Sequence, residues 1–459
     1  MKAEHPRIGI IGFGRFGRVL AGILKDDFDV RVTDVAAGDD SQSQAWPAAS
    51  KAADDMGLPF VSAGEALDSD VVFYCVPISQ LEPTLVEHAK YLNDGRKRLI
   101  VDVLSVKVHA KKVFSRLLPV GCEALLTHPM FGPDSVAARG LTDQAIVLDK
   151  FECKDETYKF WKDYFESKKL RVIEMTAEEH DRVASESQGL THFIGRVLAE
   201  FGFRYTPIDT LGAKMLHQIH EQVNNDSWQL FEDLQTLNPF TIEMRVRLSD
   251  AQSRVFNKLV PNRINKEKLV VGIQGGRGSF NEEAATYYLS RTPNVPYELV
   301  YLHTTENVLA ALYEGRIDRG QFAIHNSIGG VVGESIAAMA NYRFHIVEEY
   351  AIKIAHALMI APGADFNKCD TIMTHPQVLK QCKTNLEMKY QRLNKTSGEG
   401  DLVDHAMVAE LLSRGEIAPN VAVMGSKVLA KIHGLEIVEE GLQDLQDNFT
   451  SFLWVERPH

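Results

Sequence analysis

The glycine-rich turn near the start of the chain is the feature that most constrains its fold. An apolar run, Arg7 to Ile11, leads directly into the hexad Gly12-Phe13-Gly14-Arg15-Phe16-Gly17. Apolar residues then recur at helical spacing from Val19 to Leu24, so the local order is strand, glycine turn, helix. This order is typical of the first unit of a doubly wound α/β sheet that binds a dinucleotide.

The residues after this turn indicate which dinucleotide would fit. Gly14 lets a pyrophosphate approach the backbone, and a second predicted strand, Asp29 to Asp34, ends in an acid. A carboxylate at Asp34 accepts hydrogen bonds from a ribose and repels a 2′-phosphate, and residues 35–40 contain no lysine or arginine. The pattern predicts NAD, with NADP less favoured; a glycine turn without a cofactor is the alternative reading.

The composition of the chain argues against several classes of binding partner. The 459 residues are 45% apolar and 24% charged, as in ordinary globular proteins, and are enough for two or three domains. The net charge of −12 argues against nucleic acid or anionic membrane as a partner. Five cysteines without paired spacing predict neither a disulfide framework nor a metal site, which fits a reducing, cytoplasmic compartment.

A histidine in a stiff loop is the candidate catalytic group. Buried-type strands at Val71 to Val76 and Leu99 to Val103 end near Pro77 and Ser105, at the sheet edge where ligands bind. His128 follows within Thr127 to Pro133, a loop stiffened by two prolines and a glycine. It is placed to exchange a proton, although it could instead only cap a strand. Ser105 could fix the tautomer of His128 or cap the helix that follows.

From about Ala177 to Leu259 the period is helical, with a break around Arg204 to Asp209. Thr176 and Glu179 make a predicted capping box at its start. His180, Gln188 and His192 fall near one helical face, where each alone is more often a core or surface residue. Arg182, Arg196 and Arg204 are read as solvated.

A new domain begins after a basic linker. Leu269 to Ile273 reads as a strand, Gly275 to Gly278 as a glycine turn, and Ser279 as a helix cap. This turn lacks the Lys-Ser/Thr of a phosphate loop, so a second nucleotide site is not favoured. Further strands alternate with helices, which predicts a two-lobed α/β domain with a ligand cleft between the lobes.

Several of these segments resemble a known family. The glycine hexad, Val101 to Lys107, Thr127 to Pro133, and Glu178 to Asp181 followed by Gln188 and His192 resemble the tyrosine-pathway arogenate/prephenate dehydrogenases, most of all the plant-type arogenate enzymes. The resemblance implies oxidative decarboxylation of a cyclohexadienol, with His128 taking the proton of the ring hydroxyl and Ser105 supporting that contact. It also implies a homodimer formed through the helical domain. Activity is expected to rise with pH near the imidazole pKa of about 6.5.

The departures from the family bear on the substrate and on the cofactor. Plant-type members hold NADP with a serine-arginine pair, where this chain has Asp34-Val35-Ala36. Prephenate-type members carry an arginine about where Gln218 stands here, and arogenate-type members carry a threonine and an aspartate that Thr210 and Asp226 match. The resemblance therefore favours arogenate over prephenate. A helix N-cap is the alternative reading of Asp226.

The second half, about residues 269 to 456, resembles the catalytic domain of prephenate dehydratase. The segments that carry the likeness are Gly278-Ser279-Phe280, Ala323 to Ser327, Thr374 to Gln377, Lys395 to Ser397 and Asn448 to Phe452. Dehydratases have Pro-Ile-Glu-Asn and Thr-Arg-Phe where this chain has Ala323-Ile324-His325-Asn326 and Thr450-Ser451-Phe452. Two charged groups are missing, so this domain is expected to bind tyrosine or phenylalanine without efficient dehydration. A relict kept only for packing is the alternative, and His325 could still serve as an acid.

The predicted architecture is α/β plus α: a Rossmann domain (1–174), a helical substrate and dimerisation domain (175–260), a linker (261–268) and a two-lobed, periplasmic-binding-like α/β domain (269–459). A dehydrogenase with an attached sensor is the favoured function; a bifunctional dehydrogenase/dehydratase and a non-catalytic amino-acid-binding regulator are the alternatives. The predicted site residues are His128 and Ser105 (catalytic); Gln188, His192, Thr210 and Asp226 (substrate); Gly12, Phe13, Gly14, Arg15, Phe16, Gly17, Asp34, Val76 and Pro77 (cofactor); and Ser279, Asn326, Ser327, Thr396, Ser397 and Thr450 (C-terminal cleft).

Overall fold

The computed structural model describes residues 6–34, 46–261, 263–291, 295–398 and 405–458. Contacts divide the chain into two units, Met1–Asp250 and Ala251–His459. No helix within the described ranges is long and apolar enough to cross a membrane. Residues 35–40, which entered the argument for NAD, lie outside these ranges.

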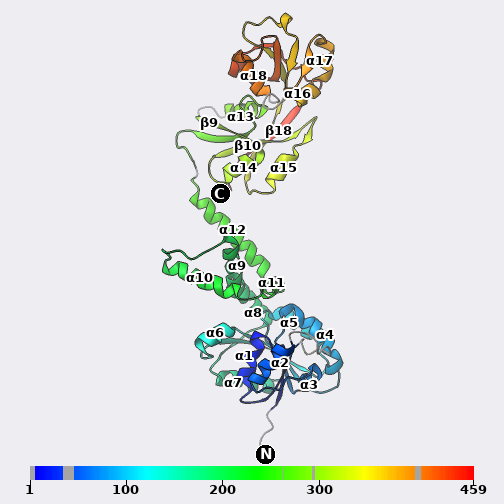
Figure 1. Cartoon of the computed structure of the whole chain (residues 1–459), viewed down its shortest axis with the longest axis vertical. Helices are drawn as coiled ribbons and strands as arrows, with labels where there is room; N and C mark the ends of the chain where they lie inside the picture. Colours follow the sequence, from blue (N-terminus) through cyan, green and yellow to red (C-terminus); the bar gives the residue numbers. More distant parts are fainter. Residues whose placement is uncertain (1–5, 35–45, 262, 292–294, 399–404, 459) are drawn as a thin grey trace, which may run out of the picture. The chain divides into compact units, whose positions relative to one another are not determined.

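The first unit contains a seven-stranded sheet in the order β2-β1-β3-β4-β5-β6-β7 (Figure 1). All neighbouring strands are parallel except β5 and β6, which are antiparallel. The strands are β1 (Arg7–Ile11), β2 (Asp29–Thr33), β3 (Val71–Tyr74), β4 (Leu99–Asp102), β5 (Glu123–Pro129), β6 (Ala145–Glu152) and β7 (Arg171–Glu174). The helices that connect them are α1 (Arg15–Leu24), α2 (Trp46–Asp55), α3 (Ala63–Leu67), α4 (Leu81–Leu92), α5 (Lys107–Leu117), α6 (Pro133–Arg139) and α7 (Asp155–Ser167).

The central strands read as continuous apolar runs because both faces of the sheet are covered. In β3, Val71 and Phe73 join one buried cluster, together with Trp161 of α7. Val72 and Tyr74 point the other way and join a second cluster, which includes Leu85 of α4. Alternate residues of one strand therefore supply two separate cores.

The rest of the first unit is helical, as the period predicts. It comprises α8 (Ala177–Ala184), a π-helical turn (Ser185–Gly189), α9 (Leu190–Phe201), α10 (Leu211–Asn224), α11 (Trp228–Thr236) and most of α12 (Thr241–Leu259). The predicted capping box at the start of α8 is confirmed: Thr176 Oγ1 accepts from Glu179 N–H at 3.3 Å, and the Glu179 carboxylate accepts from Thr176 N–H at 2.9 Å.

The second unit has two lobes, each with its own sheet (Figure 1). The first sheet has the order β12-β18-β10-β8-β9, with β11 paired to β10, and the second has the order β15-β14-β16-β13-β17. The chain leaves the first sheet after β12 and returns to it as β18, so both lobes share two crossing segments. The strands are β8 (Leu269–Gln274), β9 (Tyr297–His303), β10 (Arg319–Asn326), β11 (Gly330–Val331), β12 (His345–Lys353), β13 (His356–Ile360), β14 (Thr371–Met373), β15 (Asn394–Thr396), β16 (Val421–Ser426), β17 (Glu436–Glu439) and β18 (Phe449–Glu456). The helices are α13 (Phe280–Ser290), α14 (Thr305–Tyr313), α15 (Gly333–Met339), α16 (Pro376–Gln381), α17 (Lys383–Lys389), α18 (His405–Ser413) and α19 (Val428–His433).

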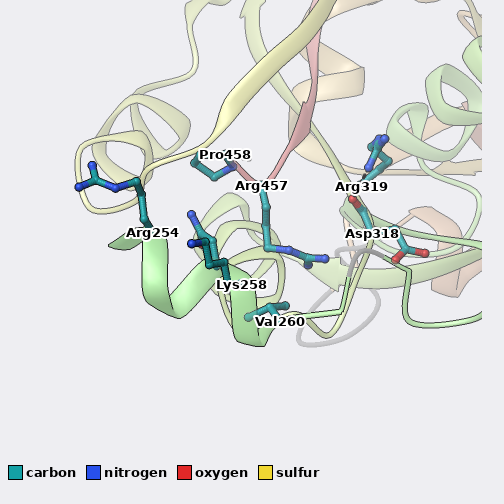
Figure 2. Close-up of a pocket in the computed structure, with 8 residues that line it drawn as sticks. Arg254, Lys258, Val260, Asp318, Arg319, Arg457 and Pro458 are labelled. Carbon is teal, nitrogen blue, oxygen red and sulfur yellow. Dashed lines mark hydrogen bonds between the residues drawn. The ribbon is translucent and has the colours of Figure 1, made fainter. Parts of the chain in front are cut away.

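The segment predicted as a linker is fastened to the second unit. Arg457 donates to Pro261 O at 2.7 Å and to Ile317 O at 2.9 Å, and Asp318 accepts from Ile264 N–H at 2.9 Å. Figure 2 shows Arg457 and Asp318 beside a cavity of about 350 Å³ at the end of α12. Because Arg457 and Asp318 form these hydrogen bonds with backbone groups, they hold the linker in place.

Two glycines of the hexad sit in tight backbone geometry. Gly12 has φ +96°, and a Cβ on Gly17 would lie 2.1 Å from Gly12 O. A Cβ on Gly14 would meet nothing within 4 Å. Gly17 is therefore required for packing of α1 on the sheet, whereas Gly14 is not.

We expect Gly17→Ala to lower the thermal unfolding midpoint, because overpacking against backbone costs about 1–3 kcal/mol. Gly14→Ala is the matched control and should lower the midpoint less, since its Cβ would meet nothing within 4 Å and only the preference of the N-cap position for glycine over alanine is lost. Calorimetry of the whole chain measures both, and equal destabilisation by the two variants would contradict this assignment.

Candidate active site

The predicted dinucleotide edge forms a cavity. Its volume is about 300 Å³, within the range of small-ligand sites. Five predicted cofactor residues line it: Gly12, Gly14, Asp34, Val76 and Pro77. The lining is completed by Ile11, Thr33, Ala63, Cys75, Thr84, Glu87 and His88.

The geometry of the cavity fits an adenosine diphosphate group. The open side of Gly14 leaves room for a phosphate at the start of α1. The Asp34 carboxylate accepts from Phe13 N–H at 2.6 Å, which fixes it beside the turn. Phe13 and Phe16 do not line the cavity: Phe13 is buried in the core, and Phe16 packs against Phe131 with ring centroids 6.2 Å apart.

A chain of buried polar groups lies behind His128, at the end of β5. His128 Nδ1 is 2.8 Å from His180 Nε2, and His180 Nδ1 is 2.8 Å from Asp181 Oδ1. All three side chains are at most 3% exposed. Two helices and two strands, α6, β6, α7 and β7, lie between His128 and His180 in the sequence. The contact between the two rings is therefore made by the tertiary structure and could not be read from local spacing.

Asp181 also caps α5. Its Oδ1 accepts from Lys107 N–H and its Oδ2 from Val108 N–H, both at 2.8 Å. These are the first N–H groups of α5, which have no partner inside the helix. The carboxylate therefore holds the helix start and His180 together.

A buried ion pair lies under the same edge. Lys107 Nζ binds Asp102 Oδ2 and donates to Thr127 O, next to His128, at 2.5 Å. Burial lowers the pKa of His128 well below its usual 6.5, and the neighbouring His180 and Lys107 lower it further. The ring is therefore neutral at pH 7 and can accept a proton. The lowered pKa of the buried ring moves the expected rise of activity to below pH 6.5.

Ser105 does not have the predicted contact. His180 occupies Nδ1 of His128, and no hydrogen bond joins Ser105 to the His128 ring. Nor does Ser105 cap α5: the N-cap position is Val106, and the capping group is Asp181. In the structure His180 contacts the His128 ring and Asp181 caps this helix, so Ser105 has neither contact. A role of Ser105 in supporting the substrate contact stays a prediction.

Three side chains line one stripe of the π-helical turn and α9. Gln188, His192 and Arg196 follow each other at four-residue spacing, and each has a buried polar atom without a partner (Oε1, Nδ1 and Nε). Arg196 is held by Asn224 Oδ1 at 3.0 Å and by Asp226 O at 2.8 Å. It is not the solvated residue that the sequence suggested.

Asp226 lies beside this stripe, and Thr210 does not. Burial lowers the pKa of His192, the charge of Asp226 raises it and that of Arg196 lowers it, so these three groups are neighbours. Arg15 of the glycine turn approaches Asp226 Oδ1 at 3.6 Å. Thr210 is the exposed N-cap of α10, whose 14 residues place it about 21 Å from the end that leads to Asp226. Within one chain Thr210 and Asp226 therefore lie far apart, and substrate binding by Thr210 stays a prediction. The N-cap reading of Asp226 is also wrong, because Ser227 caps α11.

The predicted C-terminal residues fall into two groups. Asn326 Nδ2 donates to Thr450 Oγ1 at 2.9 Å across β10 and β18, and Ser327 accepts from Phe449 N–H at 2.9 Å. Thr396 and Ser397 belong to the second lobe, at the end of β15. Ser279 caps α13, accepting from Glu282 N–H at 3.4 Å. The predicted capping box of Ser279 and Glu282 is wrong in its second half, because the Glu282 carboxylate accepts from Gly278 N–H.

The sequence missed His180, Asp181, Lys107, Asp102 and Arg196 as functional candidates. The signal for His180 and Asp181 was present, because both directly follow the capping box in a segment that matches the family motif. Their partners lie on β5 and α5, and helical spacing carries no information about such contacts.

A dinucleotide-type cavity and a buried neutral imidazole at the same edge of the sheet place the first unit among the nicotinamide-dependent dehydrogenases. Comparison with known proteins makes this specific. Residues 25–174 match the family described as prephenate dehydrogenase, nucleotide-binding domain; residues 197–269 match "TYRAAT1-like, C-terminal domain"; and residues 271–459 match prephenate dehydratase.

Each half of the chain is also similar to individual proteins. The chain is 33% identical over 266 residues to arogenate dehydrogenase 2, chloroplastic, of Arabidopsis thaliana, covering 56% of this chain and 71% of that protein. It is 29% identical over 201 residues to arogenate dehydratase/prephenate dehydratase 2, chloroplastic, of the same plant, covering 44% of this chain and half of that protein. The solved prephenate dehydrogenase from A. aeolicus with hydroxyphenyl propionate and NAD+ is 16% identical, with a TM-score of 0.44 over 63% of this chain and 97% of that chain.

The chain belongs to the arogenate/prephenate dehydrogenase family of oxidoreductases. Its second half matches the prephenate dehydratase family over residues 271–459.

We expect His128→Asn to lower kcat by about 10² or more while leaving the affinity for NAD unchanged, because the ring lies outside the cavity that fits the adenosine. Turnover with arogenate and NAD binding by calorimetry measure the two effects. Equal losses of kcat and NAD affinity would contradict a role in proton transfer. The kcat/KM of the native chain should begin to fall only below pH 6.5, since acid must protonate a ring of lowered pKa.

Proposed function

We propose that this protein oxidises and decarboxylates arogenate with NAD, forming tyrosine. The single observation that carries the proposal is the buried, neutral His128 at the sheet edge that also carries the dinucleotide cavity. The similarity to arogenate dehydrogenase 2 supports this choice of reaction.

The residues of this chain would act on the substrate hydroxyl. His128 accepts the proton of this hydroxyl as the hydride leaves the ring carbon that carries it. The ring carboxylate is then lost as carbon dioxide, and the ring becomes a phenol. NAD, when bound, supplies the hydride acceptor. Asp181 and His180 keep the imidazole in place, and the burial of all three excludes water from the reacting edge.

The choice of NAD rests on charge. Asp34 and Glu87 line the cavity, and none of the lining residues is a lysine or arginine. A 2′-phosphate there would meet two carboxylates and no cation. Val35 and Ala36, which replace the family's serine-arginine pair, lie outside the described residues.

The choice of arogenate rests on Asp226 and Arg196. The Asp226 carboxylate is 28% exposed and already faces a cation, Arg15, so it is suited to an ammonium group. Arg196 lies over Trp228 and Phe231 at 5.5 Å from each ring centroid, and these contacts fix its guanidinium group. We propose that this guanidinium binds the substrate carboxylate. Gln218, where prephenate-type members carry an arginine, is exposed on α10.

We expect the protein to form tyrosine from arogenate with NAD, with higher kcat/KM than for prephenate or with NADP. Asp226→Asn should narrow the arogenate-to-prephenate ratio of kcat/KM about tenfold, because it removes a negative charge that attracts the ammonium group of arogenate and repels the keto acid prephenate. Chromatographic identification of the aromatic products measures both ratios.

Asp134→Asn is the matched control, since Asp134 also pairs with Arg15 but lies on α6. If prephenate were used equally well and Asp226→Asn changed nothing, the proposed substrate would be wrong.

For the second unit we propose a sensor for tyrosine or phenylalanine; a dehydratase that makes the protein bifunctional is the second candidate. The lost glutamate and arginine disfavour dehydration, and His325 is exposed on β10. Asn326, Ser327 and Thr450 remain together as neutral hydrogen-bonding groups suited to a small zwitterion.

We expect millimolar tyrosine or phenylalanine to raise the unfolding midpoint of the whole chain, and Thr450→Ala to remove most of this shift, because it deletes a hydroxyl of the proposed site. Thr371→Ala, on the second sheet, is the control. Without NAD, prephenate should give no phenylpyruvate above its spontaneous rate. Rapid phenylpyruvate formation that Thr450→Ala abolishes would establish the dehydratase instead.

We further propose that the protein forms a homodimer through α9 and α10. We also propose that it works in a reducing compartment and that its domains have the boundaries predicted from the sequence. Apolar side chains exposed on and between these helices support the dimer; they are Val197, Phe201, Tyr205, Ile208, Leu211, Met215 and Leu216. All five cysteines are free, which suits a reducing compartment.

A further inference from the structure

The hydrogen bonds behind His128 determine which of its nitrogens carries a proton. Asp181 accepts two backbone N–H groups and is therefore suited to the ionised form, which can only accept. The 2.8 Å contact with His180 Nδ1 then requires a proton on that nitrogen. A neutral His180 presents a lone pair at Nε2, so the 2.8 Å contact with His128 requires the proton on His128 Nδ1.

The consequence is that Nε2 of His128 is left with a lone pair. This is the tautomer that a general base needs if the substrate binds on the Nε2 side. Asp181 thus selects the tautomer of His128 through His180, across two hydrogen bonds.

We propose that His128, His180 and Asp181 form a two-histidine proton relay, in which His180 takes up the proton that His128 would otherwise keep. This inference rests on the proposed dehydrogenase function. His128 is the catalytic base, His180 is the second proton carrier, and Asp181 is a positioning residue.

The proton movements balance. As the hydride leaves the substrate, the hydroxyl proton moves to His128 Nε2, and the Nδ1 proton of His128 moves to His180 Nε2. His128 stays neutral in its other tautomer, and the new positive charge lies on His180, in contact with the Asp181 carboxylate. Loss of carbon dioxide leaves a phenolate, which takes a proton from His128 Nε2 while the Nδ1 proton returns from His180 Nε2, so the phenol forms and the starting tautomer is restored.

The charges around the relay favour this direction. Lys107 from α5 places a cation near His128, which opposes a positive charge on that ring. Asp181 lies against His180 itself, and the other carboxylates near this edge, Asp102 on β4 and Asp149 on β6, both act on Lys107. A proton on His180 is thus next to a carboxylate, whereas a proton kept on His128 is nearer to the ammonium group.

The tautomers can be measured without substrate or cofactor. The ¹⁵N spectrum of the whole protein, labelled at histidine and recorded near pH 7.5, should show His128 protonated at Nδ1 and unprotonated at Nε2. His128→Asn and His180→Gln assign the two rings. A proton on Nε2 of His128 would overturn the relay, because His180 would then be the donor and His128 could not act as the base.

Kinetics test the transfer itself. His180→Gln keeps an oxygen that can accept from His128 Nδ1 but cannot carry a proton, so kcat should fall about tenfold or more while KM for NAD stays unchanged. The acid limb of kcat/KM should move to higher pH, because His128 loses a neighbour that lowers its pKa. A proton inventory in mixed H₂O and D₂O should change from two transferred protons to one.

The control is His220→Gln on α10, away from the relay, with midpoints of unfolding recorded for every variant. A His180→Gln enzyme with an unmoved acid limb and an unchanged proton inventory would overturn the relay. If the native protein turned over none of the proposed substrates, the dehydrogenase proposal would fail, and the ¹⁵N spectra would still decide the relay.

Discussion

The carboxylate of Asp181 is the group on which the candidate site depends. It accepts the first two N–H groups of α5 and the Nδ1 proton of His180, while none of its own side chain is exposed. Its loss would leave two helix N–H groups without partners and His180 without an orienting contact. A single side chain on α8 thus joins the helical segment to the sheet at the point where proton transfer is proposed.

The buried ion pair of Lys107 and Asp102 stabilises the same edge of the sheet. A buried ion pair is weak evidence for stability, because desolvation offsets the attraction between its charges. Here the pair connects specific groups: Asp102 Oδ1 accepts from Thr127 N–H at 3.2 Å, and Lys107 donates to Thr127 O. It fixes the backbone that precedes His128 and adds a positive charge that keeps the ring neutral.

The packing of the second unit does not depend on the two charged groups that its dehydratase-like motifs lack. Its first lobe depends on apolar packing of residues such as Phe322, Leu453 and Val455, none of which needs the charges that the dehydratase motifs have lost. The remaining polar groups bond to each other, as Asn326 does with Thr450. The fold of the second unit does not by itself imply dehydratase activity, which depends on the side chains of its ligand cleft.

The sequence by itself determined the features that depend on neighbours along the chain. The glycine hexad, the Thr176 capping box and the buried strands were readable because turn geometry, helix capping and burial act over a few residues. The cavity residues from Gly12 to Pro77 could be grouped because parallel strands bring their carboxyl ends to one edge.

Only the tertiary structure decided which groups meet across elements. Ser105 was the natural partner for His128 from strand order, yet α8 brings His180 to that position. Thr210 and Asp226 match a family spacing, yet α10 holds them at opposite ends because each helical residue adds 1.5 Å. Contacts of this kind depend on how helices pack on the sheet, and local spacing carries no record of that packing.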